Sequence, residues 1–167
     1  MGFTCAVCGE YHDELLLDIR MGLPEAVFVL SEEERAKRAN FADDAGVLHE
    51  VDGSFRFFVR GLLELPIPEL DRYFGYGTWV DVSRDDYHRL GELWSDPEAE
   101  GREFACRLAN ELTPYQDTVG LVGVLQLRSV DLLPAIALEA ADHPLVADQR
   151  RGIRLEHAEA LASTVAH

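Results

Sequence analysis

The dipeptide Asp52-Gly53 restricts how this chain can fold more than any other feature of the sequence. It separates two runs with strand character, residues 46–51 and 55–65, and Asp-Gly in that position is typical of a tight turn between antiparallel strands. Arg60 lies inside the second run, and a buried arginine there needs a carboxylate partner. Further strands are predicted, in chain order, at residues 26–30, 77–82, 118–128 and 132–138. These runs favour an antiparallel sheet at the centre of the fold.

Capping signals that begin with serine predict two helices. Ser31, with Glu34 three residues later, forms a capping box, so a helix is expected over about residues 31–39. Ser83, with Asp86 three residues later, repeats the pattern, and the apolar residues that follow recur at helical spacing. Each of these helices is expected to begin directly after a predicted strand.

The C-terminal part of the chain adds two more predicted helices. Asp142 or His143 can cap the first, with Pro144 as its first helical residue and Gly152 just beyond its end. The second is an amphipathic helix over residues 155–165. Strands gathered centrally, with helices at several points and no regular strand–helix–strand alternation, predict an α+β fold.

The length of the chain bounds the domain organisation. A chain of 167 residues suffices for one domain with a substantial core. We therefore expect a single domain over residues 1–167, divided into a metal-binding segment, residues 1–14, and an α+β body, residues 15–167. The expected architecture is a central antiparallel sheet with flanking helices and an N-terminal turn that resembles a zinc knuckle.

The charge and the hydropathy of the chain restrict its expected partners and location. Fifteen lysines and arginines against 31 aspartates and glutamates give a net charge of −16, which repels phosphate, so nucleic acid is not an expected partner. No apolar run approaches the roughly 18 residues of a membrane span. The N-terminus lacks the basic and apolar regions of a secretory signal, so a cytoplasmic location is expected. An acidic surface suits a partner protein with a basic surface.

The spacing Cys5-x-x-Cys8-Gly9-x-x-His12 carries the clearest chemistry in the chain. Two cysteines separated by two residues can direct their sulfurs at one ion, and Gly9 lets backbone N–H groups approach the thiolates. His12 adds an imidazole, and thiolates with an imidazole select Zn²⁺. The alternative is a pair of reduced thiols beside a surface histidine, because three cysteines in all do not suit a disulfide framework.

A closed structural zinc site needs a fourth ligand, and we expect His143 to join Cys5, Cys8 and His12. The competing role for His143 is that of a helix cap. If the fourth position held water instead, the zinc would be catalytic, with Glu14 or His143 as general base. Other candidates for the fourth ligand are Cys106, His49 and Asp13, besides Glu14 itself.

Several segments together resemble one bacterial family, domain of unknown function 2199. They are the N-terminal CxxCGxxH, GTWVDVS at residues 77–83 and HPLVADQRRGI at residues 143–153. Shorter stretches follow in the expected order: the helix start at residues 31–35, FFVRG at 57–61, LANELTPY at 108–115 and TVGLVGVLQLR at 118–128. The resemblance covers nearly the whole chain. Because the family has no established activity, it implies boundaries and candidate positions rather than a reaction.

The chain departs from the family pattern at two places. Relatives often carry a cysteine before the first hairpin strand, where residues 43–46 read DDAG. If that cysteine completes a metal site in relatives, this chain has lost the ligand or uses another one. Relatives tend to read FGWL where residues 104–107 read FACR, which makes Cys106 a weaker candidate ligand.

The sequence thus favours a small cytoplasmic zinc-binding protein that acts on another protein without catalysis, in the manner of a regulatory or immunity protein. The alternative is a zinc-dependent hydrolase with an open metal position. The first is preferred, because ligands on a short N-terminal segment usually brace a chain end.

Overall fold

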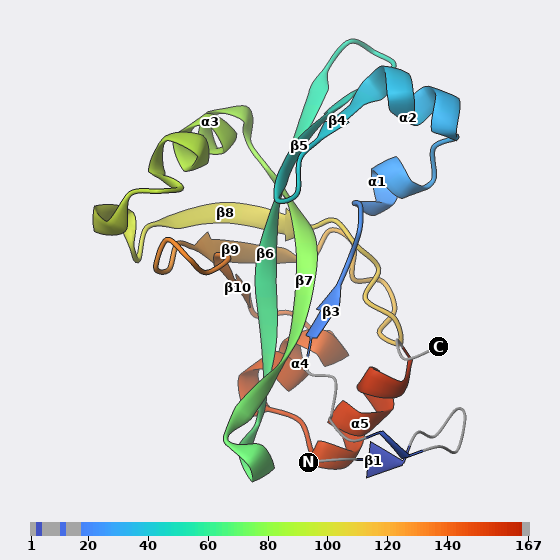
Figure 1. The fold of residues 1–167 in the computed structure, drawn as a ribbon, viewed down its shortest axis with the longest axis vertical. Helices are drawn as coiled ribbons and strands as arrows, with labels where there is room; N and C mark the ends of the chain where they lie inside the picture. Colours follow the sequence, from blue (N-terminus) through green and yellow to red (C-terminus); the bar gives the residue numbers. More distant parts are fainter. Residues whose placement is uncertain (1–2, 5–10, 13–17, 165–167) are drawn as a thin grey trace.

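A closed barrel of five strands forms the centre of the molecule in the computed structural model, which describes residues 3–4, 11–12 and 18–164 (Figure 1). Each strand runs antiparallel to the next along the chain. Because five is an odd number, the pair that closes the ring, β10 with β6, has to be parallel. The barrel strands are β6 Phe55–Ile67, β7 Arg72–Val82, β8 Glu103–Leu108, β9 Val122–Gln126 and β10 Ala135–Leu138.

Three further strands extend the barrel into an eight-stranded sheet. β5, Ala45–His49, and β4, Ala39–Phe41, continue outward from β6 as antiparallel neighbours. β3, Asp18–Arg20, joins β7 in parallel. The strands β1, Phe3–Thr4, and β2, Tyr11–His12, form a separate antiparallel pair.

The predicted combination of helices with a mainly antiparallel sheet is therefore confirmed, and the predicted hairpin around Asp52-Gly53 joins β5 to β6. The closure of the sheet and its two parallel pairings were not predicted. The expected zinc-knuckle turn falls mostly on residues 5–10, outside the described residues. The division into residues 1–14 and 15–167 stays a prediction.

The predicted caps stand at the starts of three helices. Ser31 Oγ accepts the N–H of Glu34 at 3.1 Å, and Ser83 Oγ accepts the N–H of Asp86 at 3.1 Å. His143 caps a third helix.

No helix within the described part of the chain is both long and apolar enough to cross a membrane. The helices are α1 Glu25–Phe28, α2 Glu32–Arg38, α3 Arg84–Leu93, α4 Pro144–Arg151 and α5 Leu155–Ser163, with 3₁₀ turns η1 Pro68–Leu70 and η2 Pro97–Ala99.

The strand predicted at residues 26–30 is wrong, because this segment begins with helix α1. The Arg35 guanidinium donates to the carbonyls of Phe28, at 3.0 Å, and Leu30, at 3.2 Å, and so satisfies the end of this short helix. Val27 is buried, while Phe28 and Val29 are 65% and 74% exposed. A short apolar run does not distinguish a strand from a buried helix turn, and the run itself gives no sign of the contact with Arg35.

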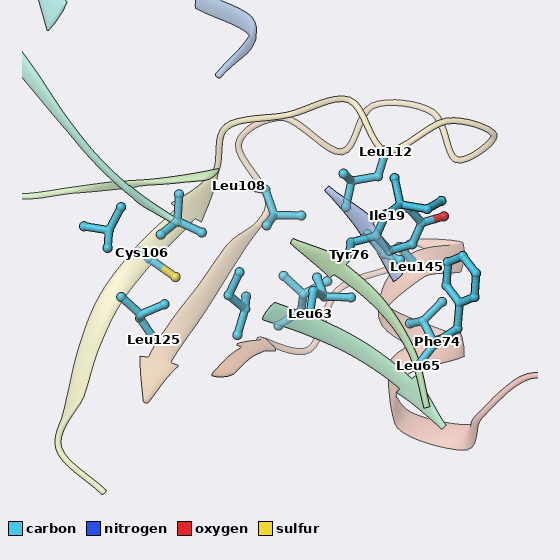
Figure 2. Close-up of a cluster of buried hydrophobic side chains, with 14 of the residues drawn as sticks. Ile19, Leu63, Leu65, Phe74, Tyr76, Cys106, Leu108, Leu112, Leu125 and Leu145 are labelled. Atoms are coloured by element: carbon cyan, nitrogen blue, oxygen red, sulfur yellow. The ribbon is translucent and has the colours of Figure 1, made fainter. Parts of the chain in front are cut away.

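Two apolar clusters lie on opposite faces of the β6–β7 hairpin. The larger includes Val80, fills the barrel and continues to α4 and α5. Leu63 and Leu125 are two of its members in Figure 2. The smaller gathers around Trp79 and Phe58. The strict alternation of side chains along residues 77–82 predicts this division. Consequently Val80 faces the barrel while its neighbour Trp79 packs beneath helix α1, whose Val27 belongs to the same small cluster.

Candidate functional site

The predicted zinc ligands fall largely outside the described residues. Cys5 and Cys8 lie outside them, and of His12 only the backbone, as part of β2, is described. Phe3 in β1 pairs with His12, and Thr4 pairs with Tyr11. The two ends of the segment that carries the CxxCGxxH spacing therefore lie side by side.

His143 occupies the N-terminal cap of α4, the role weighed against metal binding. Its Nδ1 accepts the N–H of Leu145 at 3.0 Å, and its Nε2 lies 2.7 Å from the carbonyl oxygen of Gln116. A single tautomer, protonated at Nε2, serves both contacts. To ligate zinc or to act as a general base, His143 would first have to give up one of them. Its place in the metal site stays a prediction.

The other candidate ligands that the structure describes lie apart. Cys106 is 4% exposed and points into the barrel near Leu108 and Leu125 (Figure 2). Burial raises the pKa of the Cys106 thiol to about 12, so it stays protonated at neutral pH. The ring of His49 stacks on Phe55 at a centroid distance of 4.7 Å. Among residues 18–164 no three His, Cys, Asp or Glu side chains gather where they could hold a metal ion.

Asn110 is fully buried and joins three segments of the chain. Its Oδ1 accepts from Thr78 Oγ1 at 3.0 Å and from the backbone N–H of Trp79 at 2.9 Å. Its Nδ2 donates to the carbonyl of Leu23 at 2.8 Å. The hydroxyl of Thr118 donates to the backbone carbonyl of Asn110 at 2.6 Å. Asn110 continues the β7–β8 ladder with a side chain and fastens the start of α1 to the barrel.

A second polar cluster joins the segments 108–115 and 143–153. The hydroxyl of Tyr115 donates to Asp148 Oδ2 at 2.5 Å, and His157 Nδ1 lies 3.8 Å from the same oxygen. The hydroxyl of Tyr76 is buried without a hydrogen-bond partner among the described residues. Burial raises the pKa of Tyr76 and of Tyr115, and the charge of Asp148 raises both further. Both hydroxyls therefore stay protonated at neutral pH and can only donate or accept hydrogen bonds.

Arg60 has the carboxylate partner that its position in the aromatic strand predicts. It is 3% exposed, and its Nη1 lies 3.7 Å from Asp44 Oδ1. Its Nη2 donates to the carbonyl of Met21 at 2.9 Å, and its guanidinium carbon lies 4.7 Å from the centre of the Trp79 ring. Arg60 is thus a structural cation that links the segment before α1 to the sheet.

A cleft of about 600 Å³ opens between α3 and the turn that joins β4 to β5. The turn is closed by a hydrogen bond from the N–H of Ala42 to the carbonyl of Ala45 at 2.8 Å. The cleft combines aromatic side chains of α3 and its C-terminal end with carboxylates of the turn, and no lysine or arginine lines it. Sequence reasoning missed this cleft, because only the folded sheet brings the turn at residues 42–44 against α3.

Gly91 in the last turn of α3 lines this cleft, and a Cβ built on it meets no atom within 4 Å. Gly91→Ala is expected to raise the free energy of unfolding by about 0.5 to 1 kcal/mol, because alanine forms helix better than glycine. Urea unfolding measures the change. In the matched control Gly53→Ala the space is equally open, but φ is +92°, so that variant is expected to lose stability. Lower stability of Gly91→Ala would contradict the open geometry.

The fold and these polar clusters define an α+β protein built on a five-stranded barrel. The chain belongs to a family described as uncharacterized proteins conserved in bacteria (DUF2199), whose family model matches residues 4–153. The resemblance based on the sequence motifs is thus confirmed. Comparisons with curated proteins and with solved structures yield no match.

Proposed function

We propose that this protein binds a structural zinc ion and acts in the cytoplasm by binding another protein, without catalysis of its own. The observation that carries the zinc assignment is the spacing Cys5-x-x-Cys8-Gly9-x-x-His12, which suits two thiolates and an imidazole on one ion. The pairing of Phe3 with His12 supports it, because it brings the ends of this segment together. A fourth ligand, with His143 as the leading candidate, closes the site.

Charge supports a role in protein binding. A net charge of −16 attracts basic surfaces and speeds encounter with them. Side chains that could do catalytic work, such as Tyr115 and Asp148, are held in a hydrogen bond that braces the fold. This contact favours a binding role, as in a regulatory or immunity protein, over hydrolysis.

The metal content of the purified protein tests the zinc assignment. We expect about one zinc per chain in the wild type, as in structural zinc sites, and little in Cys8→Ser, measured by inductively coupled plasma mass spectrometry. Cys106→Ala, which removes a cysteine buried in the barrel, should keep the metal. Equal zinc in Cys8→Ser and wild type would refute the assignment of Cys8.

His143 permits a sharper variant. Asparagine caps helices well but has no imidazole, so His143→Asn keeps the cap of α4 and removes the proposed ligand. Loss of zinc from a folded His143→Asn variant would support His143 as the fourth ligand. Retention of zinc would refute that assignment and leave His143 only its role as the cap of α4.

Affinity capture from the native host tests the proposed partner. The bound protein should carry a basic surface, and its dissociation constant should rise steeply with salt, because exposed charges are screened. Failure to capture a protein even at low salt would count against a role in protein binding.

A further inference from the structure

We propose that the cleft between α3 and the β4–β5 turn receives an arginine side chain of the basic partner protein. This inference rests on the proposed function, since it names the part of the partner that this surface recognises. Three features of the cleft support it: its apolar floor, its aromatic side chains and the exposed carboxylate of Asp43 at its rim.

The floor of the cleft suits the apolar stem of a long side chain. Val59 of β6 and Leu90 of α3 line it and are 2% and 1% exposed. Tyr87 and Trp94, both half-buried, add aromatic surface. Arginine pairs a three-methylene stem with a planar cation that stacks on aromatic rings, whereas the lysine ammonium is a strongly hydrated point charge.

The charge at the rim selects a cation. Asp43 and Asp44 line the cleft. The Asp44 carboxylate lies 3.7 Å from Arg60 and 3.9 Å from Arg20, so it is already shared between two cations. Asp43 is exposed and forms no ion pair with any residue in the described part of the chain. Asp43 is therefore the carboxylate that remains for an incoming guanidinium.

The fold already holds one arginine in such surroundings. Arg60 lies over the ring of Trp79 at 4.7 Å and 3.7 Å from Asp44. An arginine that enters the cleft would meet the same kinds of group, an aromatic side chain and a carboxylate of the same turn. The cleft, at about 600 Å³, lies within the range of pockets that enclose small ligands, about 300 to 1,000 Å³, so one side chain enters it easily.

Titration of ¹⁵N-labelled protein with the peptide acetyl-Gly-Arg-Gly-amide tests the cleft directly. We expect saturable chemical-shift changes at the amides of Ala45, His88 and Gly91, which line it. The citrulline peptide is a neutral isostere of the arginine peptide and should bind at least about ten-fold more weakly, because it loses both the charge-assisted contact and the cation–π contact. Equal shifts with both peptides, or shifts spread over acidic residues all around the molecule, would overturn the proposal.

Two pairs of variants separate the cleft from general charge. Gly91→Trp places a large ring in the open space beside α3 and should abolish the saturable shifts, while Gly91→Ala keeps them. Asp43→Asn should weaken binding about two- to five-fold, as expected for one exposed ion pair. Glu156→Gln removes an equal charge from α5 and should leave binding unchanged. Unchanged binding by a folded Gly91→Trp variant would refute the assignment.

The same variants distinguish a failure of the cleft proposal from a failure of the proposed function. Figure 1 shows α3 and the β4–β5 hairpin toward one end of the long axis and β1 toward the other. A captured partner that binds Gly91→Trp as tightly as wild type would overturn the cleft and leave the function standing. Saturable arginine binding by a protein that captures no partner would support the cleft and contradict the function.

Discussion

Asn110→Ala is expected to lower the free energy of unfolding by about 3 to 5 kcal/mol, because it strands several buried polar groups at once. The variant removes the acceptor of Thr78 Oγ1 and of the Trp79 N–H, and the donor to the Leu23 carbonyl. Each buried group left unpaired costs about 1 to 3 kcal/mol. Little water can replace the amide, since Asn110 and Thr78 are both fully buried.

Chemical denaturation followed by far-ultraviolet circular dichroism measures this loss. Asn40→Ala is the matched control, because Asn40 lies exposed on the edge strand β4 and should change stability by less than about 0.5 kcal/mol. Asn110→Asp keeps an acceptor for Thr78 and Trp79 but loses the donor to Leu23, so it should also be strongly destabilised. A loss below about 1 kcal/mol for Asn110→Ala would show that other groups satisfy this site.

The stability of the protein is expected to fall steeply above about pH 9, where cysteine thiols begin to titrate in the unfolded chain. Burial raises the pKa of Cys106 to about 12 and raises those of Tyr76 and Tyr115. The folded protein keeps these protons to higher pH than the unfolded chain does. Their contribution to the free energy of unfolding is complete below the pKa values that these groups have in the unfolded chain. It is lost as pH rises toward the higher pKa values that they have in the folded protein. Each proton adds a slope of up to about 1.4 kcal/mol per pH unit.

Urea unfolding between pH 7 and 11 measures this dependence. From the Cys106 thiol alone we expect a loss of about 2 to 3 kcal/mol by pH 11. Cys106→Ala and Tyr115→Phe each remove one of these groups, so both should show a shallower alkaline decline than wild type. A wild-type stability that stays flat to pH 11, or slopes identical in all three proteins, would contradict the burial of these protons.

Local signals predict the elements of this fold well. Ser31 and Ser83 cap their helices through contacts three residues away, and Asp52-Gly53 joins two adjacent strands. Each of these features depends on neighbours in the sequence, so the sequence alone identifies it. The short run at residues 26–30 is misread because Arg35, which ends helix α1, lies outside it.

Contacts between distant segments could not be predicted in the same way. Asn110 belongs to a segment that resembles the family pattern, yet its partners Leu23 and Thr78 are far away in the chain. The cleft between α3 and the β4–β5 turn likewise depends on the sheet, which brings Asp43 against α3. For the zinc ligands the sequence remains the basis of the prediction, since Cys5 and Cys8 lie outside the described residues.

The parallel pairing of β10 with β6 sets an order on the assembly of the molecule. β10 is the last strand among residues 18–164, and Ala135 lies opposite Leu62 in its register with β6. During synthesis, the seam therefore stays open until the C-terminal part of the chain has left the ribosome. Until then one edge of β6 and one edge of β9 expose unpaired backbone N–H and C=O groups. Strands of other nascent chains could pair with these edges. In a protein truncated before Ala135 those strand edges would stay exposed, and the protein would be prone to aggregate.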